Sequence, residues 1–383
     1  MTMKTIREIF QDKLAAYLAA DKAGKGRILD AVCGTTGVHR KAATRRFGEL
    51  ARRDSGNRHD RRGRRTIYGK TVIDALHEAW EIENRICAER LHPQLAEYVR
   101  VLRRDRMWRH GKEATVLLCR MSLGTMKAKI AQFENVRKKG GRGTTKPSDL
   151  KEIIPIRRGP WADPPPGFGE VDTVAHCGTT LLGDYCYSVQ YTDVATIWTC
   201  LAGQWNKTEE GTVASITRIR RRLPFALLGI DPDSGGEFIN WLLAGWCRRR
   251  NIQMTRTRPY MKNDHARIEQ KNYANVRHIV GYTRFDDERQ VEVLNELYDV
   301  LEDYLNFFLP SQKCVRKERI GSRYVKQYDQ AKTAYQRALE HPGIDPSVKE
   351  KLRKKYATLN PKLLKQEKDR LVRKLLSFRP KLR

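Results

Sequence analysis

The chain has 383 residues, and 75 lysines and arginines against 45 acidic residues give it a formal net charge of +30 at pH 7. That length suits about two to four domains, and such a charge attracts a polyanion. The sequence contains no apolar run long enough to span a membrane and no Cys-x-x-Cys pair among its eight cysteines. These absences leave nucleic acid as the expected partner and argue against a zinc knuckle or a disulfide framework. The N-terminal residues lack the apolar core of a signal peptide, so we expect a cytoplasmic, nucleoid-associated protein.

Residues 1–55 are predicted to form a helix-turn-helix DNA-binding domain. Apolar residues recur at helical spacing between Ile6 and Leu18, and a glycine-bearing turn at 34–37 precedes a basic helix with Phe47 on its inner face. A small three-helix bundle with a solvated basic face is the alternative. The side chains expected to face DNA are His39, Arg40, Lys41, Arg45 and Arg46.

A basic linker over 56–68 leads to a second helical module over 69–135, which is also predicted to be a helix-turn-helix DNA-binding domain. One helix is marked by apolar residues between Val72 and Trp80, and Ser122 is a plausible cap for a second recognition helix. The predicted DNA contacts on the opening turns of that helix are Thr125, Lys127 and Lys129.

Glycine, proline and charge mark residues 136–158 as a linker, and the catalytic domain is expected over 159–310. Three antiparallel strands followed by alternating helix and strand predict an α/β mixed sheet with flanking helices. Residues 311–383 are predicted to be basic and helical, with no run of alternating strands. The expected strands of the domain are 170–176, 184–192, 195–202, 226–231 and 252–256, and its expected helices are 210–222, 236–250 and 291–309.

Three acidic residues in this domain have the contexts that a metal site needs. Asp172 lies in a β-favouring segment, Asp233 ends another before a Gly-Gly turn, and Glu269 lies nearly two turns into a helix that Asn263 can cap. Carboxylates from two strand ends and a helix suit Mg²⁺, which prefers oxygen ligands. Two such ions can activate an attacking oxygen and stabilise the leaving oxygen of a phosphodiester.

Other polar residues compete for a place in this site. We interpret Asp193 as a turn residue, Asp231 as structural, and Glu237 as the start of a helix whose dipole suits its charge. His176 shares a strand face with Asp172, and packing near the metals is favoured over ligation. Candidate phosphate contacts, with a solvated helix face as the alternative, are Lys262, His265 and Lys271.

The segments Pro166–Asp172, Asp231–Asn240 and Arg258–Asn272 resemble the integrase core of bacterial insertion-sequence transposases. Asp233 and Glu269 are separated by 35 residues, the spacing typical of retroviral-type integrase cores, and Ser234 departs from the Asn that the family usually has there. The resemblance implies a ribonuclease H-like fold with a five-stranded mixed sheet. It also implies that Asp172, Asp233 and Glu269 are catalytic and bind two Mg²⁺ or Mn²⁺ ions.

This resemblance predicts a DNA transposase. Residues 1–135 would bind the inverted-repeat ends of a transposon, and the core would cleave there with metal-activated water and join the freed 3′-hydroxyl to target DNA. One acidic triad per chain and two ends per reaction predict a dimer or larger assembly on double-stranded DNA. Two alternatives stay open: a nuclease of the same fold without strand transfer, and a catalytically inactive DNA-binding regulator. The apolar stripe over 352–364 would either hold subunits together or dock within the chain.

Overall fold

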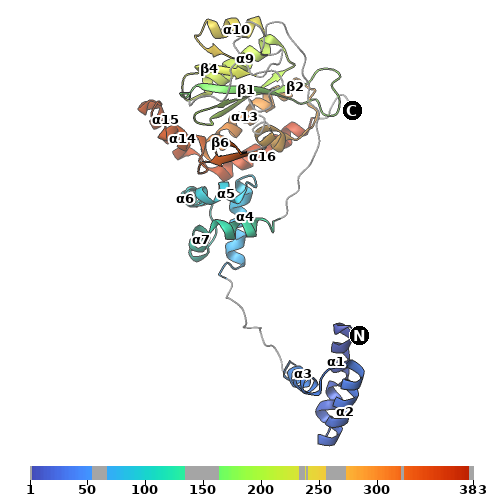
Figure 1. The fold of residues 1–383 in the computed structure, drawn as a ribbon. Helices are drawn as coiled ribbons and strands as arrows, with labels where there is room; N and C mark the ends of the chain where they lie inside the picture. Colours follow the sequence, from blue (N-terminus) through green and yellow to red (C-terminus); the bar gives the residue numbers. More distant parts are fainter. Residues whose placement is uncertain are drawn as a thin grey trace. The chain divides into compact units, whose positions relative to one another are not determined.

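A computed structural model describes residues 2–53, 67–133, 164–232, 238, 240–255, 273–320 and 323–378. The chain forms two compact units, residues 1–67 and residues 68–383 (Figure 1). None of the helices in the described part combines the length and the apolar character that a membrane crossing requires.

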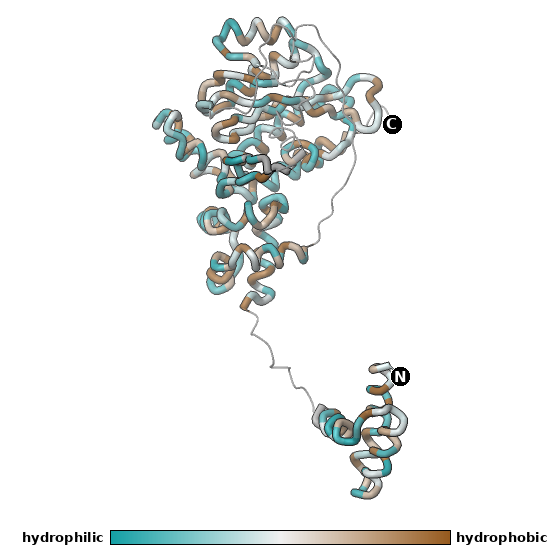
Figure 2. Tube along the Cα trace, viewed as in Figure 1, coloured by the Kyte–Doolittle hydropathy of each residue, from teal (hydrophilic) through white to brown (hydrophobic). Residues whose placement is uncertain are grey.

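The first unit is a bundle of three helices. Phe10 and Phe47 are fully buried in its core, and the ring of Tyr17 stacks on Phe47 with centroids 4.2 Å apart. Figure 2 shows hydrophobic and hydrophilic residues interspersed along these helices, as expected for a bundle with one buried face. The second helix ends at Gly37, whose φ of 71° suits glycine, and the basic helix follows as predicted. The helices are α1 (Met3–Ala19), α2 (Lys22–Thr36) and α3 (Arg40–Arg53).

The second unit begins with a module of short helices built around Trp80, which is 1% exposed. Ser122 caps the last of them as predicted, because its Oγ accepts a hydrogen bond from the Thr125 backbone N–H at 3.3 Å. The elements are α4 (Lys70–Ile82), α5 (Ala88–Leu91), η1 (His92–Gln94), α6 (Leu95–Arg104), α7 (Lys112–Cys119) and α8 (Leu123–Ile130).

A five-stranded sheet in the order β3-β2-β1-β4-β5 forms the centre of the second unit (Figure 1). β2 is antiparallel to β1 and β3, whereas β4 is parallel to β1 and to β5. This mixed sheet with helices on both faces has the ribonuclease H-like topology, so the predicted fold class is confirmed. Its strands are β1 (Phe168–Ala175), β2 (Cys186–Asp193), β3 (Thr199–Trp205), β4 (Gly229–Pro232) and β5 (Gln253–Met254).

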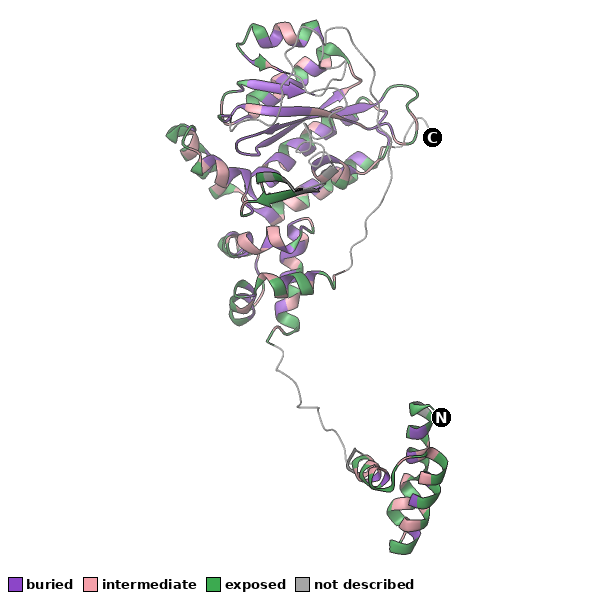
Figure 3. Ribbon diagram, viewed as in Figure 1, coloured by how far each residue is buried: buried purple, intermediate pink, exposed green. Residues whose placement is uncertain are grey.

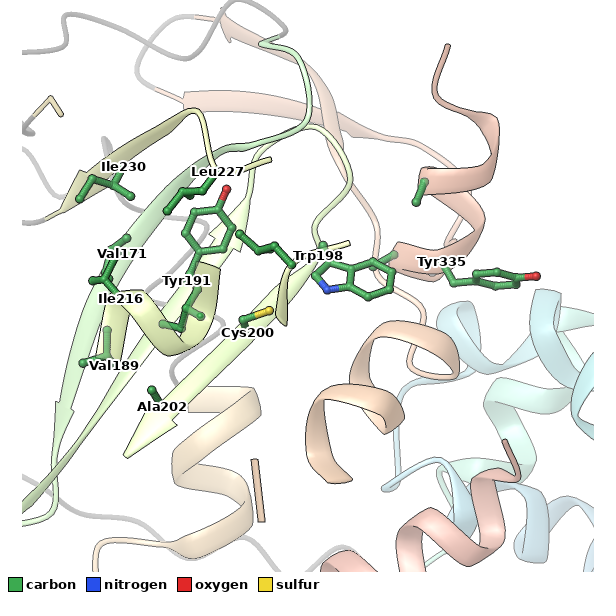
Figure 4. Packing of buried hydrophobic residues seen from close by; sticks show 14 of the residues in the cluster. Val171, Val189, Tyr191, Trp198, Cys200, Ala202, Ile216, Leu227, Ile230 and Tyr335 are labelled. Atoms are coloured by element: carbon green, nitrogen blue, oxygen red, sulfur yellow. The ribbon is translucent and has the colours of Figure 1, made fainter. Parts of the chain in front are cut away.

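Each face of the sheet packs against its own helices because successive strand residues point to opposite sides. Figure 4 shows Val171, Val189 and Tyr191 of the strands packed around Ile216 of α9 (Glu209–Arg222). α10 (Trp241–Arg248) belongs to the same cluster. The opposite face is covered by α13 (Gln290–Phe307) and α16 (Pro361–Leu376). β2 is buried along its whole length, as Figure 3 shows.

The prediction that residues 311–383 are helical is confirmed within 334–376 and wrong for 314–328. A two-stranded antiparallel hairpin precedes three helices, and it was missed because its strands carry charged residues where an apolar alternation would mark a half-buried strand. The helical pair expected beyond residue 349 is present. The elements are β6 (Cys314–Ile320), β7 (Arg323–Tyr328), α14 (Ala334–Glu340), α15 (Pro346–Thr358) and α16.

The apolar stripe over 352–364 docks within the chain. Leu352 is buried in the cluster that also holds the sheet, and Tyr356, Leu359 and Leu364 pack against it, whereas Leu363 remains 52% exposed. Of the two roles considered for this stripe, the structure therefore supports the intramolecular one.

Glu302 of α13 is a buried carboxyl that ties this helix to the sheet. Its Oε1 accepts a hydrogen bond from the Leu201 N–H at 2.7 Å, and its Oε2 lies 2.9 Å from Nη2 of Arg222. Burial raises the pKa of Glu302 from 4.5 to about 7, and the attraction of Arg222 only partly opposes this.

Because the folded state holds this proton more tightly than the unfolded state, the stabilisation is complete below pH 4.5 and is lost as the pH rises through 7. The loss is on the order of 3 kcal/mol. Glu302→Gln stays neutral, so the difference in Tm between variant and wild type should shift in favour of the variant between pH 4.5 and pH 8. A difference in Tm that does not change with pH would contradict this assignment.

Candidate active site

Asp172 lies in the middle of the sheet, on the central strand β1. It is half-buried, its Cα partner on β2 is Gln190, and its Oδ1 accepts a hydrogen bond from the Thr173 N–H at 2.7 Å. Strand alternation places Asp172 on the face that carries Val174, which is the face covered by α13. The carboxylate of Asp172 is thus held on a strand in the middle of the sheet.

Gly167 and Asp193 fix the position of the start of β1. Gly167 has a φ of 110°, and a Cβ there would lie 2.3 Å from the Ala226 carbonyl oxygen. Its N–H donates a hydrogen bond to Asp193 Oδ2 at 2.7 Å, while Asp193 Oδ1 accepts from the Thr196 backbone N–H and hydroxyl at 2.7 and 2.6 Å. Asp193 is fully buried, and burial raises its pKa. The interpretation of Asp193 as a turn residue is confirmed.

β4 places one acid, Asp231, beside β1. Asp231 is the Cα partner of Glu170; both are buried, and Asp231 Oδ1 accepts a hydrogen bond from the Thr255 hydroxyl at 2.5 Å. This contact supports the structural interpretation of Asp231. The next pair in the register is Val171 with Pro232, the last residue of β4. Asp172 follows Val171, and Asp233 follows Pro232 in the sequence.

A segment that follows Glu269 in the sequence also packs next to Asp172. The π-helical turn η3 (Tyr273–Arg277) leads into α12 (His278–Val280). Asn275 in η3 donates from Nδ2 to Gln190 Oε1 at 3.2 Å, and Gln190 is the partner of Asp172 across the sheet. Arg277 donates from Nη2 to the Ala175 carbonyl oxygen at 2.6 Å. η3 is thereby fixed across β1 and β2, next to Asp172.

Gln190 and Asn275 were not predicted as site residues. Both side chains are buried, at 0% and 2% exposure, and they join elements that are 85 residues apart in the sequence. The available signal was a glutamine inside an otherwise buried strand, since a buried amide requires a partner.

His176 packs beneath this region. It is fully buried, its Nε2 lies 2.6 Å from Ser188 Oγ, and its ring centroid is 4.8 Å from that of Phe285. Burial first, and then the charge of Arg277, lower the pKa of His176 to about 3, so the ring is neutral. These contacts support the packed interpretation of His176.

Asp172 is the member of the predicted triad that the structure describes. Asp233 and Glu269 lie outside the described residues, as do Glu237, Lys262, His265 and Lys271. Among the described residues, no three His, Cys, Asp or Glu side chains are grouped so that they could hold a metal ion. Asp172 is thus the one residue of the predicted metal-binding triad whose position the described residues include.

The predicted DNA contacts on α3 and on the turn before it are at the surface of the first unit. His39, Arg40, Lys41 and Arg45 are exposed, and Arg40 is paired with Asp30. Arg46 is partly buried, with its guanidinium 5.0 Å from the centroid of Phe10.

The predicted contacts on α8 differ in accessibility. Lys127 is exposed, and its Nζ lies 2.8 Å from Glu89 Oε1. Thr125 and Lys129 are partly buried. Of these three, Lys127 presents the most accessible charge.

The chain is 35% identical over 348 residues to Uncharacterized protein y4rM of Sinorhizobium fredii (strain NBRC 101917 / NGR234), and the alignment covers 90% of this chain and 95% of that protein. The chain therefore belongs to the family of that protein. No family model matches the chain.

Two structures of the HTLV-2 integrase catalytic core domain in complex with magnesium also align with the chain. The dimeric form is 12% identical, covers 38% of this chain and 90% of its own, and has a TM-score of 0.29. The trimeric form is 13% identical, covers 38% and 87%, and has a TM-score of 0.28. Because these TM-scores are low, we draw no conclusion from the two alignments. The assignment of the fold is based on the strand order of the sheet.

Proposed function

We propose that this protein is a DNA transposase with a metal-dependent polynucleotidyl transferase core. One observation carries the proposal: the two described segments that adjoin Asp233 and Glu269 in the sequence both lie next to Asp172. β4 ends at Pro232, beside Val171, and η3 begins at Tyr273, four residues after Glu269. The sequence spacing of Asp233 and Glu269 supports the same triad.

The residues that would bind the metal ions are Asp172, Asp233 and Glu269, with two Mg²⁺ or Mn²⁺ ions as cofactors. Such ions stabilise the charge that develops on the attacking and leaving oxygens of a phosphodiester. The protein would hold the DNA phosphate in line with the attacking hydroxyl, and the buried Gln190–Asn275 hydrogen bond would keep η3 in position beside Asp172.

Double-stranded DNA is the proposed partner, both as transposon ends and as target. The net charge of +30 and the exposed cations on α3 support this choice. Because two ends must meet one target and each chain would supply one triad, we propose that a dimer or larger assembly acts on DNA. The cytoplasm is the compartment in which such an enzyme would work on the chromosome.

The test is incubation of the full-length protein with Mg²⁺ and duplexes taken from the DNA on either side of its own coding sequence. We expect cleavage at a fixed position and joining of a precut 3′-hydroxyl end to a second duplex, both abolished by EDTA. Cleavage without joining would identify a nuclease of the same fold. DNA binding with neither reaction would identify an inactive regulator.

A further inference from the structure

The hairpin formed by β6 and β7 exposes its described β7 side chains on both faces. The four consecutive residues Val325, Lys326, Gln327 and Tyr328 are all exposed, and consecutive strand residues point to opposite sides. Val315 of β6 is 58% exposed. Figure 3 shows this hairpin as an exposed element, in contrast with the buried strands of the central sheet.

A clamp fixes the base of the hairpin to α14. Asp329, just after β7, accepts a hydrogen bond from the Lys313 N–H at 2.6 Å, and its carboxylate pairs with Arg337 Nη1 at 2.6 Å. Arg337 is 9% exposed and also donates to the Ser311 carbonyl oxygen at 2.8 Å. The hairpin therefore leaves the body of the protein from a rigid base.

The two strands carry five basic residues and one acidic residue, Glu318. A two-stranded hairpin without a covered face is marginally stable in water, so its exposed faces suit a binding partner. That partner must be negative. A second copy of the same hairpin would place like charges together, whereas the major groove of DNA, about 12 Å wide, admits a two-stranded β-ribbon and is lined by phosphates.

We infer that β6 and β7 form a DNA-contacting ribbon, with Arg316 and Lys326 bound to backbone phosphates. The choice of DNA as the polyanion rests on the proposed function. Arg316 is 68% exposed and paired with Glu318 at 3.1 Å, and Lys326 stands opposite Lys317 in the register. Both Arg316 and Lys326 are exposed and thus accessible to the phosphates of a duplex.

The test measures binding of the full-length protein to a mixed-sequence DNA duplex over a range of KCl concentrations. The Arg316→Ala/Lys326→Ala protein should bind more weakly, and its plot of log K against log[KCl] should be less steep by roughly 2, because each lost phosphate contact removes about 0.9. Lys351→Ala/Lys354→Ala removes the same charge from exposed positions on α15 and should leave the slope unchanged. Equal slopes for both double variants would overturn the inference.

A second measurement identifies the binding partner of the hairpin directly. p-Benzoylphenylalanine in place of Val325 should crosslink to the duplex under ultraviolet light, and a crosslink to a second protein chain would overturn the inference by making the ribbon a subunit contact. Failure of the ribbon and failure of the proposed function are distinguishable. The salt slope measures DNA binding, whereas the Mg²⁺-dependent assay measures cleavage, so a smaller slope for Arg316→Ala/Lys326→Ala in a protein that does not cleave would uphold the ribbon and reject the proposed function.

Discussion

Asp172→Asn is expected to abolish Mg²⁺-dependent cleavage and joining while leaving DNA binding at the wild-type level. Asparagine keeps the size of the side chain and can still accept the hydrogen bond from the Thr173 N–H. It removes the charge that would hold a metal ion, which contributes several kcal/mol to transition-state stabilisation, so the rate should fall by about 10³-fold or more. Single-turnover cleavage and filter binding on the same duplex measure the two quantities.

Asp184→Asn is the matched control for this change. Asp184 is an exposed carboxylate just before β2, so the same loss of one charge there should leave activity near the wild-type rate. Glu269→Gln is expected to behave as Asp172→Asn does, with binding kept and chemistry lost. Near-wild-type cleavage by the Asp172→Asn protein would remove β1 from the catalytic site and with it the proposed triad.

Phe47→Ala is expected to unfold the first unit and leave the second unit folded. Phe47 is fully buried between Phe10 and Tyr17, so its truncation should destabilise this unit by about 3–5 kcal/mol. A domain of this size has roughly 3–8 kcal/mol of stability in total. Limited proteolysis should digest the segment 1–53 rapidly, and binding to transposon ends should weaken if this unit reads them.

Leu18→Ala provides the comparison, because Leu18 lies on α1 and is 50% exposed. That variant should resist protease as the wild type does. Equal protease resistance of the Phe47→Ala protein would show that the three helices do not depend on the core described here.

The order of strands and helices in the second unit could be predicted because its apolar patterns are strong and local. β1, β2, α9 and α13 lie within a few residues of their expected positions. β4 begins at Gly229, later than the predicted 226, although the apolar run starts earlier. The N–H groups of Leu228 and Gly229 both donate to the Gly167 carbonyl oxygen, a long-range contact that no local pattern reveals.

The site could be predicted only as far as residue type and context allow. Asp172 stays a predicted ligand, chosen for its β-favouring neighbours. Asp193 and Asp231 were interpreted as structural from their places in the strand pattern. The hydrogen bond between Gln190 and Asn275 depends on how two elements distant in the sequence pack together. The periodic spacing of apolar residues predicts helices and strands but not such a long-range contact. The same holds for the β6–β7 hairpin, whose base is joined to α14 by the ion pair between Asp329 and Arg337.

Under the proposed function, the packing of the helices α4–α8 against the rest of the second unit has a consequence for where DNA would be cut. The Tyr98 hydroxyl donates to the Phe308 carbonyl oxygen, the Tyr304 hydroxyl donates to that of Ile82, and Lys362 Nζ pairs with Glu78 at 2.6 Å. These contacts join α4 and α6 to α13 and α16, and α8 and Asp172 belong to the same compact unit. If α8 binds a transposon end, the packing within this unit sets the distance between α8 and Asp172. The number of base pairs between the bound sequence and the cut would then be constant.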